Sequence, residues 1–194
     1  MPENLLRCRP PLVLASASPR RADLLARAGI EFEQRPADID ETFRSGELVE
    51  EYVLRLAKEK ATAALQPRRC CLGADTAVSV RGEVLGKPRD SADAKRMLRK
   101  LSDRPHRVLT GVALFDFDGC FRVSALIETW VVFRALSQDE IDEYVATGDP
   151  LDKAGAYGIQ GAAGKFVEAV IGSYDNVVGL PLNELYGQLD NGHA

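Results

Sequence analysis

The segment LVLASASPRR, residues 12–21, decides how the fold begins. Its apolar start, residues 12–14, predicts a buried strand, and the small residues that follow lead to Ser18 and Pro19. Serine is a favoured N-cap and proline is favoured in the first helical turn, so a helix is expected to begin there. Apolar residues then recur with helical spacing until Gly29, where the helix should end.

Two arginines, Arg20 and Arg21, fall in the first turn of this predicted helix. Cations at that end oppose the helix macrodipole, and a bound anion would remove the conflict. Backbone N–H groups, the Ser16 and Ser18 hydroxyls and two guanidinium groups together describe a phosphate site. The alternative is a solvated arginine pair on a surface helix, which this segment alone does not exclude.

The composition is that of an ordinary globular domain. The chain has 194 residues, of which 45% are hydrophobic and 28% are charged. A net charge of −4, with Lys and Arg spread along the chain, argues against a protein that coats nucleic acid. No apolar run reaches transmembrane length, the N-terminus lacks a secretory signal, and the four cysteines form no CxxC pair. We therefore expect a cytoplasmic protein that binds neither membrane nor nucleic acid, with its cysteines as small core residues.

Helices and strands alternate along the rest of the chain. Apolar spacing predicts a helix over 47–64. Further helices are expected after an N-cap at Ser91, after a Ser137–Glu140 capping box and from Pro181. The predicted strands are 30–32, 70–80, 106–117, 120–136 and 166–171. Asp118-Gly119 predicts a hairpin, 155–164 a loop or bulged strand pair, and 172–179 a loop. Hairpin and crossover connections together indicate an α/β fold with a mixed sheet.

Two charged residues stand where apolar residues are expected. Asp75 lies inside the apolar strand segment CCLGADTAVSV, and burying it would require a metal, a cation or a proton. Strand alternation could instead place it on a solvated face. Lys60 continues the apolar stripe of the helix predicted at 47–64, so its ammonium either extends along the stripe into solvent or points into a cleft.

Four further polar residues are candidates for binding. Thr76 follows Asp75, Glu41 lies in a polar loop, Lys87 is held in a stiff Gly-Lys-Pro turn, and Gln160 stands among glycines. A stiff turn suits a phosphate-binding lysine, and glycines would let Gln160 reach the edge of a base. Each of these side chains could also simply be solvated.

The two histidines, His106 and His193, nearly exclude a metal site built from His and Cys. Carboxylates and substrate phosphates would hold any metal, which suits Mg²⁺ or Mn²⁺. We expect His106 to be a structural hydrogen-bonding residue at the start of a strand, and His193 lies near the terminus, where fraying is common. The sequence contains no GxSxG, GxxxxGK[ST] or GxGxxG motif, which disfavours Walker-type and hydride-transfer chemistry.

Several motifs in order give the chain a resemblance to the Maf family of nucleoside triphosphate pyrophosphatases. They are SASPRR (16–21), EEYVLRLAKEKA (50–61), LGADTAV (72–78), GKP (86–88), HRVLTGVAL (106–114), DKAGAYGIQG (152–161) and GSYDNVVGLPL (172–182). The DKAGAYGIQG segment resembles that of the subgroup that acts on dTTP and UTP, rather than that of the subgroup that acts on 7-methyl-GTP.

The resemblance implies a single domain over 1–194, with an elongated mixed sheet in two lobes around a deep central cleft, as in the inosine triphosphate pyrophosphatases. It also implies attack by water on the α-phosphorus, giving a nucleoside monophosphate and pyrophosphate, with Mg²⁺, Mn²⁺ or Co²⁺ as cofactor. Asp75 then matches the family's proton acceptor and Glu41 an acid near the metal and water, so both are expected at the metal. A homodimer is a family-level expectation.

The remaining site residues are carried over in the same way. Ser18, Arg21, Lys60 and Lys87 match positions that contact phosphates, and Arg20, Thr76 and Gln160 match positions that determine base specificity. One departure is Asp103, which replaces a usual glycine and is tolerable if the backbone there has a positive φ.

Two alternatives remain open. The same fold could act on another nucleotide, such as 7-methyl-GTP. The family is also associated with arrest of septum formation, so the chain could be a nucleotide-sensing regulator of cell division that lacks significant turnover.

Overall fold

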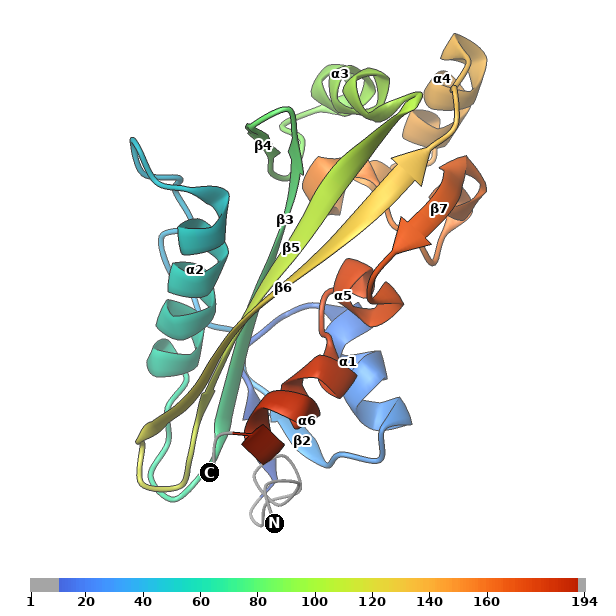
Figure 1. The fold of residues 1–194 in the computed structure, drawn as a ribbon. Coiled ribbons are helices and arrows are strands. Elements are labelled where there is room, and N and C mark those ends of the chain that lie inside the picture. The colour runs from blue at the N-terminus through green and yellow to red at the C-terminus, as the bar shows by residue number, and fades with distance from the viewer. Residues whose placement is uncertain (1–10, 192–194) are drawn as a thin grey trace. The chain divides into compact units, whose positions relative to one another are not determined.

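The computed structural model describes residues 11–191 (Figure 1). The strands are β1 (Leu12–Leu14), β2 (Phe32–Gln34), β3 (Cys71–Val80), β4 (Glu83–Leu85), β5 (Arg104–Phe115), β6 (Phe121–Phe133) and β7 (Val167–Ile171). The α-helices are α1 (Pro19–Arg27), α2 (Val49–Ala63), α3 (Ser91–Leu101), α4 (Gln138–Ala146), α5 (Tyr174–Val178) and α6 (Leu182–Asn191). Short 3₁₀ turns are η2 (Asp149–Asp152), η3 (Ala154–Ala156) and η4 (Ala162–Phe166).

Within the described residues the strands form one seven-stranded sheet in the order β2-β1-β3-β5-β6-β7, with β4 paired to β3. β1 runs parallel to β2 and β3, whereas the β3–β4 and β6–β7 pairs are antiparallel. The predicted α/β class with a mixed sheet is therefore confirmed.

The chain divides into two compact units, each with a core of its own. The first contains the described residues up to Asp75, Thr110–Ile127 and the described residues from Gly179 onward. The second contains Thr76–Leu109 and Glu128–Val178. The deep cleft between two lobes stays a prediction.

In the first unit, helix α2 lies directly against the sheet because two glycines leave room for it. A Cβ atom at Gly73 would lie 2.1 Å from the carbonyl oxygen of Ala57, and one at Gly111 would lie 2.3 Å from that of Val53. No side chain fits at either distance, so any larger residue would push α2 off the strands. Ala57 and Ala61 of α2 pack into a small-residue core with Val13, Cys71, Ala113 and Phe115.

In the second unit, the core gathers aromatic rings around a histidine. The His106 side chain is fully buried, and its Nε2 shares a 2.8 Å hydrogen bond with the Tyr157 hydroxyl. The ring of Phe133 lies edge-on to both rings, at 4.9 Å from His106 and 4.8 Å from Tyr157. The structural role predicted for His106 is confirmed.

Local signals placed most helix ends correctly. Ser18 is the N-cap of α1 and Pro19 its first residue, although the Ser18 side chain makes no capping hydrogen bond. The Ser137–Glu140 capping box of α4 is present. The predicted cap at Ser91 is wrong, because Asp90 precedes it and accepts a hydrogen bond from the backbone of Asp93 at 2.8 Å.

Other boundaries need correction. Segment 155–164 is a loop between the 3₁₀ turns η3 and η4, so the loop alternative is confirmed and the bulged strand pair is wrong, and 172–179 contains the short helix α5 rather than only loop. β5 runs over Arg104–Phe115 instead of 106–117, and β6 ends at Phe133 rather than at 136. The hairpin at Asp118-Gly119 is confirmed by the β5–β6 connection.

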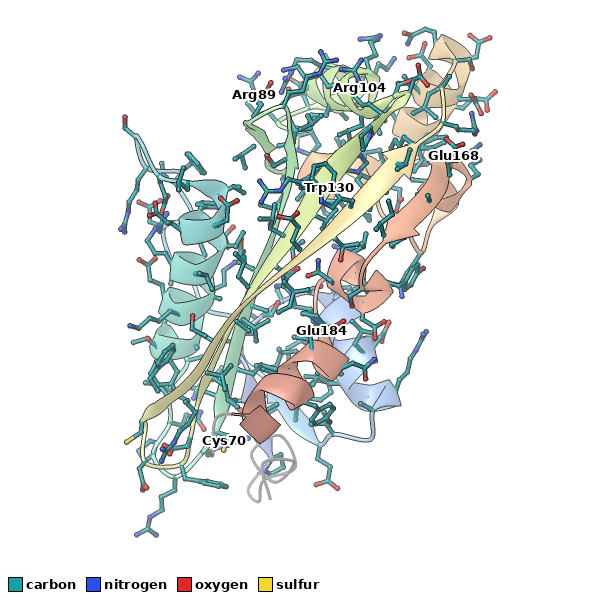
Figure 2. All side chains as sticks on the ribbon, viewed as in Figure 1. Cys70, Arg89, Arg104, Trp130, Glu168 and Glu184 are labelled. Atoms are coloured by element: carbon teal, nitrogen blue, oxygen red, sulfur yellow. The ribbon has the colours of Figure 1, made fainter. Side chains whose placement is uncertain are left out.

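The cysteine prediction holds for two of the three described thiols. Cys70, labelled in Figure 2, and Cys71 are buried, whereas Cys120 is exposed beside the hairpin turn. Cys8 and His193 lie outside the described residues. Among the described helices, none combines the length and apolar character needed to cross a membrane.

Candidate active site

The first unit brings Lys60, Asp75 and Glu41 together. Lys60 Nζ lies 2.6 Å from Asp75 Oδ1 and 2.7 Å from Glu41 Oε1. Lys60 and Asp75 are each only 8% exposed, so the solvated alternatives for these two residues are wrong. Two carboxylates from distant parts of the sequence thus converge on one buried cation.

Burial and charge act on Asp75 in opposite directions. Removal from water raises the pKa of its carboxyl, and the nearby charge of Glu41 adds to that increase. The positive charges of Lys60 and Arg21 counteract it. The pKa of Asp75 is raised overall, because the carboxyl is almost fully removed from solvent. A carboxylate with a raised pKa is a better proton acceptor near neutral pH.

Arg21 is bound to the protein itself through the hydrogen bonds resolved for its guanidinium group. Its Nε donates to the carbonyl oxygen of Gly179 at 2.8 Å, and Nη1 donates to Ser16 Oγ at 3.0 Å. Ser16 Oγ also accepts from the backbone N–H of Ser18 at 3.2 Å. Arg21 therefore braces the turn between β1 and α1, which carries the half-buried Ser18 and leads to the half-buried Arg20 in the first turn of α1. Phosphate contact by Ser18, Arg20 and Arg21 stays a prediction.

The second unit holds the other three predicted residues. Thr76 follows Asp75 on β3 and is half-buried, whereas Lys87 and Gln160 are exposed. The turn that carries Lys87 is tied to the glycine-rich segment, because Gly155 donates its N–H to the carbonyl of Gly86 at 3.1 Å. A shared site for these residues and the Lys60 cluster stays a prediction.

The segment before Gln160 is braced from within the second unit. Lys153 Nζ lies 3.0 Å from Asp149 Oδ1, and Asp149 Oδ2 accepts a 2.8 Å hydrogen bond from the Tyr144 hydroxyl. That hydroxyl in turn accepts from the backbone N–H of Gly158 at 3.4 Å. The predicted base-contacting side chain therefore extends from a supported turn.

The donor set of the first unit fits a hard divalent cation. Glu41 and Asp75 already direct carboxylate oxygens at one positive charge, and oxygen is the donor that Mg²⁺ and Mn²⁺ prefer. Among the described residues, no group of three or more His, Cys, Asp or Glu side chains could hold a metal. Two protein carboxylates would leave the other coordination positions to phosphate oxygens and water.

Sequence reasoning missed Tyr52 and Arg55, which hold the loop that contains Glu41. The Tyr52 hydroxyl donates to the Glu41 carbonyl oxygen at 3.0 Å, and burial raises the pKa of this hydroxyl to about 12, so it keeps its proton. Arg55 Nη2 donates to the carbonyl oxygen of Thr42 at 3.1 Å. The sequence offered little signal, since Tyr52 and Arg55 are three residues apart on one helix face but their loop partners are not visible in the sequence.

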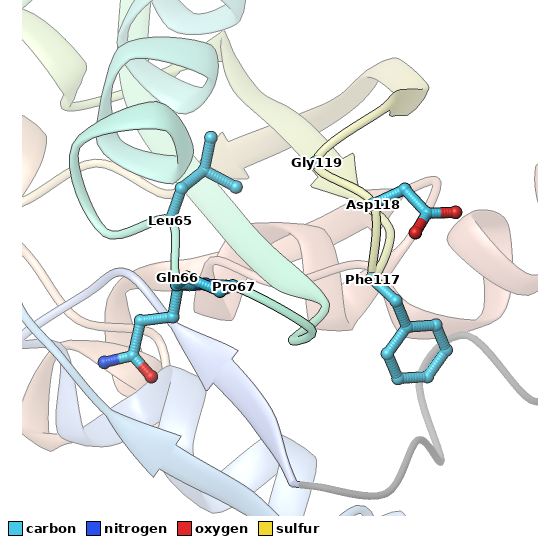
Figure 3. A pocket seen from close by; sticks show the side chains of 6 residues that line it. All are labelled: Leu65, Gln66, Pro67, Phe117, Asp118 and Gly119. Carbon is cyan, nitrogen blue, oxygen red and sulfur yellow. The ribbon is translucent and has the colours of Figure 1, made fainter.

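A separate open pocket of about 240 Å³ contains none of the predicted site residues (Figure 3). It lies between the turn after α2 and the β5–β6 hairpin and is lined by Leu65, Gln66, Pro67, Phe117, Asp118 and Gly119. Its lining offers a single ionisable side chain, so it lacks the convergent charges of the Lys60 cluster.

The comparison with known families agrees with the motifs. A model of the family described as Maf-like protein matches residues 11–192. The chain belongs to the Maf-like protein family. This Maf-like protein is 56% identical over 177 residues to a protein named dTTP/UTP pyrophosphatase from Anaeromyxobacter dehalogenans (strain 2CP-1 / ATCC BAA-258), with 90% of each chain covered.

Relatives from other bacteria carry the same name. The dTTP/UTP pyrophosphatase of Geotalea uraniireducens is 50% identical over 187 residues, covering 95% of this chain and 96% of that protein. That of Citrifermentans bemidjiense is 54% identical over 180 residues, covering 92% and 93%. A solved nucleoside-triphosphatase / dITP/XTP pyrophosphatase from Mycobacterium abscessus matches 64% of this chain and 74% of its own, at 17% identity and a TM-score of 0.38.

Proposed function

We propose that this protein hydrolyses dTTP and UTP to the nucleoside monophosphate and pyrophosphate. The convergence of Asp75 and Glu41 on Lys60 carries the proposal, because it places a buried carboxylate beside positive charge, as phosphoryl chemistry requires. Relatives at 50% to 56% identity that are named dTTP/UTP pyrophosphatase support the choice of substrate.

In this proposal, Asp75 accepts a proton from the attacking water. The water oxygen bonds to the α-phosphorus, and the bond to the oxygen that bridges the α- and β-phosphorus breaks, so that pyrophosphate leaves with that oxygen. Negative charge grows on the leaving group, and Lys60, Lys87, Ser18 and Arg21 bind it through charge-assisted hydrogen bonds. Arg20, Thr76 and Gln160 select the base.

A divalent cation, Mg²⁺, Mn²⁺ or Co²⁺, is part of the same proposal. Glu41 and Asp75 would hold it, and when bound it would neutralise charge on the triphosphate. Because one oxygen of each carboxylate contacts Lys60, a bound cation would compete with the ammonium for the two carboxylates. The ammonium is then available for a phosphate oxygen. The proposal also includes that the protein acts in the cytoplasm and assembles as a homodimer.

The test is pyrophosphate release from dTTP, UTP, CTP, GTP and 7-methyl-GTP by the wild type and by Asp75→Asn. We expect turnover of dTTP and UTP, and a loss of about 10²- to 10⁴-fold in kcat for the variant with nucleotide affinity retained. Asp139→Asn, which changes an exposed acid in the first turn of α4, is the matched control and should keep full turnover.

Three outcomes would overturn the proposal or part of it. Near-normal turnover by Asp75→Asn removes this residue as the proton acceptor. Turnover confined to 7-methyl-GTP or another nucleotide replaces the proposed substrate. Tight UTP binding by the wild type, with no turnover of any nucleotide, favours a nucleotide-sensing regulator of septum formation.

A further inference from the structure

Glu41 reaches the Lys60 cluster from a segment without regular structure. It lies in the loop 35–48 between β2 and α2, and its side chain is 44% exposed. Core packing therefore does not fix its position, yet its carboxylate lies 2.7 Å from Lys60 Nζ. Other contacts must hold the backbone at this point, since a solvated glutamate would otherwise sample many rotamers.

Two side chains of α2 hold the backbone at Glu41 and at the next residue. The Tyr52 hydroxyl donates to the carbonyl oxygen of Glu41 at 3.0 Å. Arg55 Nη2 donates to the carbonyl oxygen of Thr42 at 3.1 Å. Because two successive carbonyls are bound, both the position and the direction of the chain are fixed at the residue that carries the carboxylate.

Arg55 is itself held in place by the end of the same loop. Its Nε and Nη2 lie 2.6 Å and 2.9 Å from the two carboxylate oxygens of Glu47, a bidentate pair. The two side chains are only 13% and 8% exposed. Glu47 also accepts from the backbone N–H of Arg44 at 3.1 Å, which closes the turn before α2.

Helix α2 thus carries both Lys60 and the two side chains that bind the loop. Tyr52 and Arg55 precede Lys60 on this helix by eight and five residues. The close contacts at Gly73 and Gly111 hold the same helix against the sheet. Gly73 lies two residues before Asp75 on β3. A rigid element that carries both the cation and the loop anchors can hold two carboxylates at a defined separation.

We infer that Tyr52 and Arg55 are positioning residues, which hold the Glu41–Thr42 backbone so that the Glu41 carboxylate meets Asp75 at one cation. This inference rests on the proposed function, in which both carboxylates take part in the reaction. Without the two anchors the loop would swing into solvent and Glu41 would leave the cluster, while Asp75 and Lys60 would stay paired.

The first test is Tyr52→Phe, which keeps the ring and removes the hydrogen bond. We expect kcat for dTTP to fall about 3- to 10-fold, with little change in KM and with more Mn²⁺ needed for half-maximal activity. Tyr174→Phe, at an exposed position on α5, is the control.

A double-mutant cycle separates positioning from general loss of stability. If Tyr52 acts through Glu41, then Tyr52→Phe has no further effect in a Glu41→Gln background. Losses that multiply would overturn the inference, because Tyr52 would then act independently of the carboxylate. Normal kcat and normal Mn²⁺ dependence in the single variant would overturn it as well.

The second test needs no turnover. Trypsin cleaves after arginine, and within loop 35–48 Arg44 precedes serine whereas Arg35 precedes proline and resists cleavage. We expect Arg55→Met and, to a smaller extent, Tyr52→Phe to speed cleavage after Arg44. Arg107→Met, which breaks a surface pair with Glu128 in the second unit, should leave the rate unchanged.

These readouts keep the inference separable from the proposed function. If the wild type fails to hydrolyse nucleotides, the proposed function fails, and the cleavage rates still report whether α2 clamps the loop. If the wild type is active and cleavage after Arg44 is unchanged in both variants, the positioning inference alone is wrong.

Discussion

Each unit buries a polar pair of which one member lies on a strand, and the two pairs differ in charge. In the first unit, Asp75 on β3 is paired with Lys60 at 2.6 Å. In the second unit, His106 on β5 is paired with Tyr157 at 2.8 Å. Burial pushes both titratable groups toward their neutral forms, because it raises the pKa of Asp75 and lowers that of His106 to about 4.

If the proposed function is correct, the difference separates a structural pair from a pair that takes part in the reaction. His106 Nε2 and the Tyr157 hydroxyl share a hydrogen bond without charge among aromatic rings, so their burial is compatible with a stable core. Lys60 and Asp75 keep charges away from water, and apolar residues of similar volume would commonly be as stable or more so. The fold therefore retains the charged pair at some expense in stability, which is expected of a reactive site.

The largest effect on stability should come from Lys60→Met. The substitution leaves Asp75 buried without its closest positive charge, and removing one partner of a buried ion pair destabilises by about 3–5 kcal/mol. Urea denaturation at pH 7.5 measures this loss. Because a protonated Asp75 is tolerated in an apolar setting, the deficit relative to wild type should shrink as the pH falls.

The double variant Lys60→Met with Asp75→Asn sharpens this result. Removal of the buried charge should recover most of the lost stability without any recovery of turnover. A single variant as stable as the wild type would show that Asp75 does not depend on Lys60, and the contrast with the second unit would disappear.

A smaller effect is expected from His106→Phe in the second unit. The aromatic ring is kept, although it is larger, and the buried Tyr157 hydroxyl loses its partner, which costs about 1–3 kcal/mol. Turnover per folded molecule should remain at the wild-type value. Adding Tyr157→Phe should restore stability, and a clear loss of kcat in His106→Phe would mean that this pair is more than structural.

The pH dependence of stability gives a second measurement of the same pair. The pKa of His106 is about 4 in the folded protein and 6.5 in the unfolded chain, so the unfolded state takes up a proton first as the pH falls. His106 therefore contributes stability above pH 6.5 that is lost progressively between 6.5 and 4, up to about 3 kcal/mol. Urea midpoints across this range should fall more steeply in wild type than in His106→Phe.

Sequence patterns predicted those features that depend on residues close together in the sequence. The apolar run before Ser18 and Pro19 predicted the first strand and helix, and the apolar surroundings of Asp75 and Lys60 predicted two buried charged residues. Both are charged residues at positions where the pattern predicts apolar ones, and such an interruption can be recognised from the sequence alone.

Tertiary contacts decided the rest. Asp90 and Ser91 are both good caps, and only the hydrogen bond from Asp93 selects Asp90. Helix α5 is five residues long between glycines, too short for periodicity to reveal. Arg55 looks like a solvated helix residue in the sequence, because its partners Glu47 and Thr42 are brought to it by a loop that no local pattern specifies.

The smallest effect is expected at Asp103, where the family resemblance predicts glycine and neither polar pair is involved. Its φ is +55°, as a left-handed position requires, and aspartate tolerates this region better than most residues. Asp103→Gly relieves that strain but gives the unfolded chain more freedom, so stability should change by less than about 1 kcal/mol. Asp103→Val, with a branched Cβ at the same φ, should destabilise more than Asp103→Gly in the same urea titration. Equal midpoints for the two variants would show that backbone strain at this turn is negligible, whereas a large loss in Asp103→Gly would assign a role to the aspartate side chain itself.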